Sequence, residues 1–239
     1  MNVVCVKIGT KYGSELANRL YGMCKKNITH PFTFFCYTDD ARDLHPDIKV
    51  IPYVEQHLDV IVFNKLYLFS KEMSAVFGDQ QTVFFDLDIV IKYNIDHIVS
   101  IPAGSDLHVI KTVWRSIRKP HMFHPYYMHN INSSCMIWRP GNTTHIWEHF
   151  ISDADRFMTV YHWGMDSYMF YEHNIRGTLP TDQFYSHYYG VDEKYMMEVI
   201  NDQNVVEMRK LKHITDPIPI VLMNGPTTDR DYDQYRKYF

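Results

Sequence analysis

The sequence has few of the features that mark secreted or membrane proteins. It contains four cysteines among 239 residues, and no two of them have C-x-x-C spacing. Cys5 and Cys36 lie inside apolar runs, so we expect buried free thiols and a reducing, cytoplasmic location. No apolar run approaches the length of a membrane span, and the first residues resemble a strand rather than a signal peptide.

Excess charge of one sign is also missing. The formal net charge is −4, from 24 basic and 28 acidic side chains, and there is no long basic run. A surface that follows nucleic-acid phosphates is therefore not expected. With 46% hydrophobic and 22% charged residues the chain is globular and can bury a sizeable core. We expect one domain over residues 1–225 and a polar tail or flap over residues 226–239.

What is present is an apolar run, residues 82–91, with two carboxylates inside it. On a buried strand Asp86 and Asp88 would project from the same face, while Leu87 would point into the packing. Two like charges so close, with little water, raise each other's pKa unless a cation lies between them. Oxygen ligands alone favour Mg²⁺ or Mn²⁺ over Zn²⁺. Although D-x-D triplets also occur by chance, the apolar frame favours a metal or phosphate role.

The elements expected around this motif alternate between strands and helices. Strands are predicted at residues 2–8, 32–37 and 48–53, and helices at 14–26 and 64–77. This order indicates a mostly parallel sheet, whose ligands gather at the carboxyl ends of the strands. Asp86 and Asp88 fall at such an end. Later strands are predicted at 133–138 and 218–223, and later helices after Thr143 or Thr144 and at 167–173.

Two further segments offer weaker signals. The loop at residues 9–13 has a glycine at each end and lies between a strand and a helix, as nucleotide loops do, but it is neither G-x-G-x-x-G nor a P-loop. The segment 115–130 is rich in aromatic residues, which suits an acceptor-binding flap. It also contains His121, His124 and His129, but a zinc site is disfavoured because no cysteine or carboxylate completes a recognisable spacing.

Taken in order, these signals resemble the GT-A-fold glycosyltransferases of the glycogenin-like group, family eight and its relatives, which transfer a sugar from a nucleotide-sugar. The resemblance covers nearly the whole chain, and it rests on the order of the segments rather than on any single one. It implies one α/β domain of GT-A type, with a Rossmann-like, mostly parallel central sheet flanked by helices and the D-x-D motif at a strand end. The segments are the loop Gly9-Thr10-Lys11-Tyr12-Gly13, Thr38-Asp39-Asp40, Asn64-Lys65-Leu66, Phe84-Phe85-Asp86-Leu87-Asp88, Asn132-Ser133-Ser134, Asp166 and Asn224-Gly225-Pro226.

The resemblance also implies roles for these residues. Asp86 and Asp88 would bind Mn²⁺ or Mg²⁺, and Asp88 and Asp166 would be the catalytic residues. Asn132 to Ser134 and Asp166 would hold the transferred sugar beside the acceptor, which is a glycan, a protein or a small molecule. The nucleotide-sugar donor, expected to be a UDP-sugar, would contact Gly9, Thr10, Lys11, Tyr12, Asp39, Asp40, Lys65, Asp86, Leu87, Asn132, Ser133 and Ser134.

The chain departs from the family pattern near its C-terminus. Relatives place a third metal ligand, His, where this chain has Asn224, although an amide oxygen can also bind a hard cation. A Lys-Pro pair that grips the diphosphate is replaced by residues 226–229, so that either Arg230 supplies the charge, or the activity is low, or the donor differs. Relatives also often have Asp-Gln where this chain has Asp166-Ser167.

The predicted function is metal-dependent transfer of a sugar to an acceptor hydroxyl, with retention of anomeric configuration. Two alternatives stay open. Residues 84–90 also satisfy the opening motif of haloacid-dehalogenase phosphatases, in which Asp86 would be the nucleophile and Asp88 the general acid. That motif normally starts the chain, and here about a third of the chain precedes it. The substituted C-terminal motif would instead suit a degenerate transferase that binds a nucleotide-sugar without turning it over.

Overall fold

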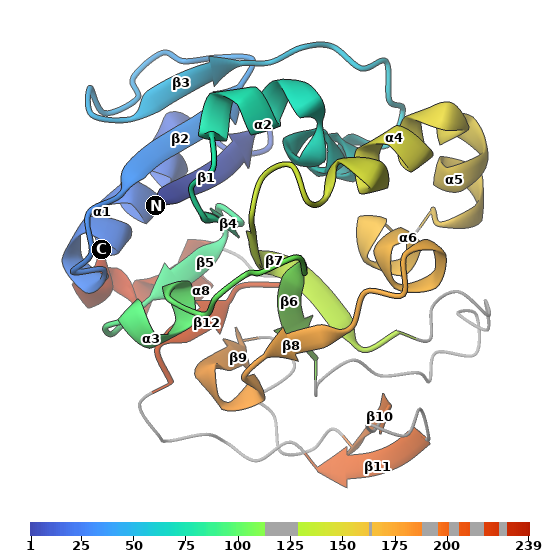
Figure 1. Cartoon of the computed structure of the whole chain (residues 1–239). Helices are drawn as coiled ribbons and strands as arrows, with labels where there is room; N and C mark the ends of the chain where they lie inside the picture. The colour runs from blue at the N-terminus through green and yellow to red at the C-terminus, as the bar shows by residue number, and fades with distance from the viewer. Residues whose placement is uncertain (113–128, 163, 188–195, 201–205, 211–217, 225–228) are drawn as a thin grey trace.

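The computed structural model describes residues 1–112, 129–162, 164–187, 196–200, 206–210, 218–224 and 229–239 (Figure 1). The first half of the chain contains β1 (Asn2–Lys7), α1 (Ser14–Asn27), β2 (Thr33–Thr38), β3 (Lys49–Pro52), the 3-10 helix η1 (Ile61–Phe69), α2 (Lys71–Phe77), β4 (Thr82–Phe85), β5 (Ile89–Ile91), α3 (Asp96–Val99) and β6 (His108–Lys111). The second half contains β7 (Ile131–Trp138), α4 (Thr144–Ser152), α5 (Ala154–Val160), α6 (Met165–Glu172), β8 (Gly177–Leu179), η4 (Thr181–Gln183), β9 (Phe184–Ser186), β10 (Met196–Ile200), β11 (Val206–Lys210), β12 (Ile220–Leu222), α8 (Asp229–Asp233) and η5 (Arg236–Tyr238).

The strands form a central sheet and two smaller ones. The seven-stranded central sheet has the order β3-β2-β1-β4-β7-β6-β8. Its first four strands are parallel, β7 runs antiparallel to β4 and β6, and β8 is parallel to β6. A three-stranded sheet has the order β5-β12-β9, and β10 pairs with β11. The predicted α/β class with a mostly parallel central sheet is therefore confirmed.

Both faces of the central sheet are buried, because its strands are apolar at successive positions. In β1, Val3 and Cys5 join one core cluster and Val4 joins the other. The first cluster lies between the sheet and α1, α3 and the small sheet of β5, β12 and β9. The second lies between the opposite face and η1, α2, α4, α5 and α6, which are grouped together in Figure 1. Successive residues of a strand in this sheet therefore point alternately into the first and the second core cluster.

Two predicted elements are interrupted in the structure. The helix expected at residues 64–77 is η1 followed by α2, because Ser70 has an extended backbone (φ −66°, ψ 163°) and its Oγ accepts a hydrogen bond from the Met73 amide, which begins a new helix. The strand expected at residues 82–91 is β4 and β5, which belong to different sheets. Residues 86–88 form the turn between them, so Asp86 and Asp88 do not alternate along one strand.

The last residues of the chain pack against the first core cluster. Tyr235 is buried, and Tyr232 and Tyr238 pack against the same cluster. The Arg19 guanidinium carbon lies 4.5 Å from the ring centre of Tyr232 and 4.3 Å from that of Phe239, which holds this segment beside α1. The division into residues 1–225 and a tail over the site stays a prediction.

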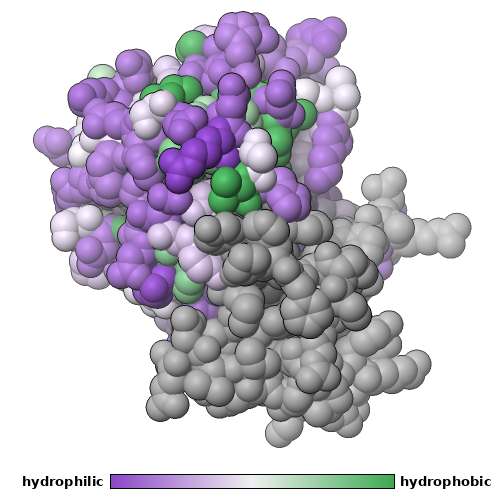
Figure 2. Space-filling view, turned by 90° about the vertical axis from the view of Figure 1, so that its right-hand side faces the viewer, coloured by the Kyte–Doolittle hydropathy of each residue, from purple (hydrophilic) through white to green (hydrophobic). Residues whose placement is uncertain are grey.

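All four cysteines are buried and free, as predicted. The helices within the described ranges include none with both the length and the apolar surface needed to cross a bilayer. Figure 2 views the molecule from the side of α4, α5 and α6, where the described surface is largely hydrophilic and apolar residues form small groups.

Candidate functional site

The two acids of the D-x-D motif lie on the turn that joins the two sheets. Asp86 follows β4 directly, at the carboxyl end of a strand as predicted, and Phe84 two residues earlier faces the layer that contains η1. The side chain of Lys65, in η1, extends to the Asp86 carboxylate. Its Nζ lies 2.5 Å from Asp86 Oδ1, and its side chain and that of Asp86 are only 19% and 20% exposed. The Lys65 Nζ is also 5.2 Å from the centre of the Phe84 ring.

The charge of Lys65 is held by acids around it. Burial alone lowers the pKa of its ammonium, and this is the largest single influence. The carboxylates of Asp86, Asp166 and Asp88 together outweigh burial, so the pKa of Lys65 is raised. The two acids of the D-x-D motif and Asp166, 78 residues after Asp88, are therefore close enough to act on one ammonium group.

Asp88 has a different environment from Asp86. Its Oδ2 accepts a hydrogen bond of 2.9 Å from the Tyr12 hydroxyl. Burial, and then the neighbouring Asp86 carboxylate, raise the pKa of Asp88, while Lys65, Tyr12 and Lys11 act in the opposite direction. The expectation that both acids project from one face of one strand is wrong, because the turn directs Asp86 to Lys65 and Asp88 to Tyr12.

A bulge in β7 connects Asp86 to Asp166. The register between β6 and β7 shifts, so that Ile110 pairs with Asn132 whereas Val109 pairs with Met136. Within the bulge the Ser134 carbonyl accepts a hydrogen bond of 3.0 Å from the Asp86 amide. The Ser133 amide donates one of 3.1 Å to Asp166 Oδ1, in the first turn of α6.

The Asn132 side chain shapes the same bulge. Its Oδ1 accepts a hydrogen bond of 3.0 Å from the Ser134 amide. The predicted sugar-binding segment, residues 132–134, therefore lies between the D-x-D turn and Asp166.

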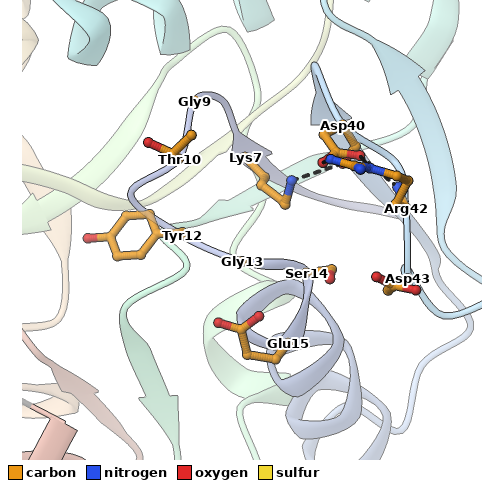
Figure 3. A pocket seen from close by; sticks show the side chains of 10 residues that line it. All are labelled: Lys7, Gly9, Thr10, Tyr12, Gly13, Ser14, Glu15, Asp40, Arg42 and Asp43. Atoms are coloured by element: carbon orange, nitrogen blue, oxygen red, sulfur yellow. Dashed lines mark hydrogen bonds and ion pairs between the residues drawn. The ribbon is translucent and has the colours of Figure 1, made fainter.

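The predicted nucleotide loop lines a cavity of about 370 Å³ (Figure 3). Gly9 has φ +73°, a conformation that favours glycine, and its amide donates a 2.8 Å hydrogen bond to Asp39 Oδ2. Lys7, which is 4% exposed, donates a 2.9 Å hydrogen bond to the Asp40 carbonyl. The residues lining the cavity are Lys7, Gly9, Thr10, Tyr12, Gly13, Ser14, Glu15, Asp40, Arg42 and Asp43.

Arg42 was not among the predicted site residues, yet it forms one side of this cavity (Figure 3). Its Nε and Nη2 donate hydrogen bonds of 2.9 and 2.7 Å to the two carboxylate oxygens of Asp40. This two-point contact holds the pKa of Asp40 well below its usual range. The only sequence signal for it was an arginine two residues after an acid in a turn.

The third predicted metal ligand lies near the D-x-D turn. The Met223 amide donates a 3.0 Å hydrogen bond to the Asp88 carbonyl, which places Asn224 at the same end of the small sheet. The Asn224 Oδ1 accepts a 2.6 Å hydrogen bond from Ser186 Oγ. Among the described residues, no group of three or more His, Cys, Asp or Glu side chains could hold a metal ion. Carboxylate and amide oxygens are nevertheless the type of ligand that a hard divalent cation prefers.

The remaining predicted residues have the following positions. Leu87 is buried at the centre of the turn, and Lys11 Nζ lies 4.6 Å from the centre of the Tyr12 ring. Most of the proposed acceptor flap, including His121 and His124, lies outside the described residues. His129 is described, and it is buried beside Phe170. Residues 225–228 and the side chain of Arg230 are also outside them.

The sequence matches no family model and no curated protein, but the structure is similar to solved glycosyltransferases. It aligns with an active-site mutant of LgtC with a TM-score of 0.65 and 9% identity, over 95% of this chain and 89% of that one. It aligns with the galactosyltransferase LgtC in complex with donor and acceptor sugar analogues with a TM-score of 0.57 and 11% identity, over 95% and 88%. A third neighbour is the bifunctional glycosyltransferase WbbM, with a TM-score of 0.54 and 11% identity. The alignment covers 78% of this chain and 40% of WbbM.

These similarities establish the fold. The chain has the fold of LgtC and WbbM, as the resemblance to GT-A-fold glycosyltransferases predicted. At 9 to 11% identity, residue roles must be argued from the geometry of this chain.

Proposed function

We propose that this protein is a glycosyltransferase that moves a sugar from a nucleoside diphosphate sugar, a UDP-sugar in the first place, to an acceptor hydroxyl with retention of configuration. The observation that carries the proposal is the convergence of Lys65, Asp86, Asp88 and Asp166 beside the cavity of the glycine-bounded loop, in a glycosyltransferase fold. One neighbour with that fold is LgtC in complex with donor and acceptor sugar analogues, which supports the same pair of ligands here.

The donor would lie between the loop cavity and the β7 bulge. Its nucleoside would occupy the cavity beside Gly9 and Asp40, and its diphosphate would extend toward the D-x-D turn. The Lys65 ammonium supplies a positive charge at the turn, although burial would otherwise disfavour it. The sugar would then lie near Ser133 and Asp166, whose carboxylate is fixed by the Ser133 amide and can accept hydrogen bonds from sugar hydroxyls.

The residues that would hold Mn²⁺ or Mg²⁺ are Asp86 and Asp88 through their carboxylates and Asn224 through its amide oxygen. When bound, such an ion stabilises the negative charge that develops on the departing diphosphate. The chain contributes position and charge. The acceptor oxygen bonds to the anomeric carbon as the carbon–oxygen bond to the diphosphate breaks and its electron pair leaves with the phosphate. The proton of the acceptor hydroxyl passes to the departing phosphate oxygen. Exclusion of water would favour transfer over hydrolysis.

The proposal predicts that Asp88→Ala loses activity without losing the fold. We expect manganese-dependent transfer or hydrolysis of a UDP-sugar to fall by at least about 100-fold, because a pre-positioned charge is removed. The urea unfolding midpoint should change little, because relief of the repulsion with Asp86 offsets the lost hydrogen bond from the Tyr12 hydroxyl. Asp106→Ala is the matched control, since this exposed acid lies 3.3 Å from Ser105 and away from the turn. An Asp88→Ala enzyme with full activity contradicts the proposal.

The two alternatives give different results. A phosphatase would form an aspartyl-phosphate analogue at Asp86, but this carboxylate is engaged by Lys65 and the fold is that of glycosyltransferases. A non-catalytic binder would show Mn²⁺-dependent nucleotide binding without turnover. A thermal-shift screen of nucleotide-sugars with and without Mn²⁺ identifies the donor, because a ligand of the native state raises the apparent stability.

A further inference from the structure

Asp86 already has a cationic partner. The Lys65 Nζ is 2.5 Å from its Oδ1, and about four fifths of each side chain is buried, at 19% and 20% exposure. A buried ion pair is costly to break, because it leaves two desolvated charges without compensation. Any divalent cation that uses Asp86 must therefore compete with the ammonium group of Lys65.

Asp88 is held by a weaker partner. Its hydrogen-bond donor among the described residues is the neutral Tyr12 hydroxyl, and the carboxylate of Asp86 lies close enough to repel it. In the absence of nucleotide, a metal ion can therefore bind the Asp88 carboxylate without breaking an ion pair. To gain Asp86 it must displace Lys65, whose charge burial disfavours unless another anion replaces the carboxylate.

A diphosphate is an anion that can replace it. We propose that Lys65 exchanges partners, from Asp86 to the diphosphate of the donor, so that the divalent cation and the diphosphate each bind more tightly when the other is present. This inference rests on the proposed function, because it needs a nucleoside diphosphate and a metal at this site. Linkage makes the coupling reciprocal, and couplings between protein sites are typically about 5- to 150-fold in affinity.

The first test measures Mn²⁺ binding without nucleotide, from the electron paramagnetic resonance signal of the free ion. Lys65→Met should bind Mn²⁺ at least about fivefold more tightly than the wild-type protein, because Asp86 has lost its competitor. Lys65→Arg should resemble the wild type, because it keeps the charge. Lys71→Met is the neutral control, since Lys71 pairs with Glu148 at 2.6 Å on the surface.

Lys11→Met controls for charge acting through space. Lys11 lowers the pKa of Asp88 while its ammonium lies over the Tyr12 ring, so its removal should increase Mn²⁺ affinity less than removal of Lys65. An equal increase in both variants overturns the inference.

The second test approaches the ion pair from the other side and does not depend on Lys65→Met being folded. Calorimetry with UDP in the presence of EDTA should show tighter binding to Asp86→Asn than to Asp88→Asn, because only the first substitution releases Lys65. Equal UDP affinities for the two variants overturn the partner exchange.

The outcomes separate the two claims. A wild-type protein that binds UDP and Mn²⁺, with Lys65→Met unchanged or weaker toward Mn²⁺ alone, overturns only the partner exchange. A wild-type protein that binds neither ligand overturns the proposed function and the exchange with it.

Discussion

Acidification should destabilise the protein through a histidine at the end of α6. The His173 Nε2 lies 2.9 Å from the Tyr168 hydroxyl and 3.3 Å from His149 Nδ1. Burial, and then the neighbouring His149 and His145, lower the pKa of His173 to about 4 from the ordinary value of 6.5, although Glu172 acts in the opposite direction. The folded protein therefore keeps His173 neutral where the unfolded chain would protonate it.

The size of the effect follows from this difference. A shift from 6.5 to about 4 corresponds at most to roughly 3 kcal/mol, at about 1.4 kcal/mol per pKa unit. The ring is partly exposed, so solvent screening reduces this to about 1–2 kcal/mol. Between these pH values the unfolded chain binds the proton and the native state does not. The free energy of unfolding should thus be highest above pH 6.5 and fall as the pH is lowered toward 4.

Urea unfolding at a series of pH values from 8 to about 4.5 measures this contribution. His173→Gln, which cannot titrate, should lose part of the dependence on pH that the wild type shows below 6.5. His57→Gln is the matched control, since the His57 side chain is 84% exposed and should keep the full dependence. A His173→Gln variant with the same pH dependence as the wild type refutes the reasoning.

Two more predictions concern the β7 bulge and the edge of the sheet. Asp166→Asn keeps an oxygen that can accept the hydrogen bond from the Ser133 amide, so stability should change little while sugar transfer falls at least about tenfold. Asp166→Ala leaves the Ser133 amide unpaired, so it should also lower the free energy of unfolding in urea by about 1–3 kcal/mol. Gly177→Ala should destabilise by about 2 kcal/mol or more, because the new Cβ would lie 2.3 Å from the backbone of Lys111, and the thermal midpoint should fall by several degrees.

Each of these has an outcome that contradicts it. If Asp166→Asn transfers sugar at the wild-type rate, the carboxylate charge is not used. If Asp166→Ala is as stable as Asp166→Asn, the Ser133 amide finds another partner. A Gly177→Ala protein with an unchanged melting temperature means that β8 can move away from β6 without cost.

The sequence indicated the first elements well because their signals are local. The strand at residues 2–8 and the helix at 14–26 correspond to β1 and α1, since apolar periodicity and a glycine turn are read within one segment. It also predicted the acids and Lys65 as site residues. It missed the break between β4 and β5, because a continuous apolar run does not reveal that its two halves pair in different sheets.

Contacts between segments that are distant in the chain could not be predicted from the sequence. Tyr12 was predicted only as a contact of the donor, and nothing in the sequence indicated that its hydroxyl donates a hydrogen bond to Asp88, 76 residues away. Asp166 was placed near a sugar only by the resemblance, whereas its bond to the Ser133 amide depends on a bulge that forms only when β6 and β7 pair. The Arg42 contact with Asp40 joins residues only two positions apart, but it too was missed, because it depends on the conformation of the turn after β2. Such geometry is set by packing rather than by local propensity.

The turn at residues 86–88 gives the two sheets a common joint. Asp86 extends from the large sheet, whereas Asp88 and Asn224 extend from the small one, with the Met223 amide bonded to the Asp88 carbonyl at 3.0 Å. A ligand that contacts these side chains would add a link at this turn between two sheets that also pack against each other through the first core cluster. Binding of such a ligand should therefore slow the local opening of β5 and β12, which amide hydrogen exchange would measure.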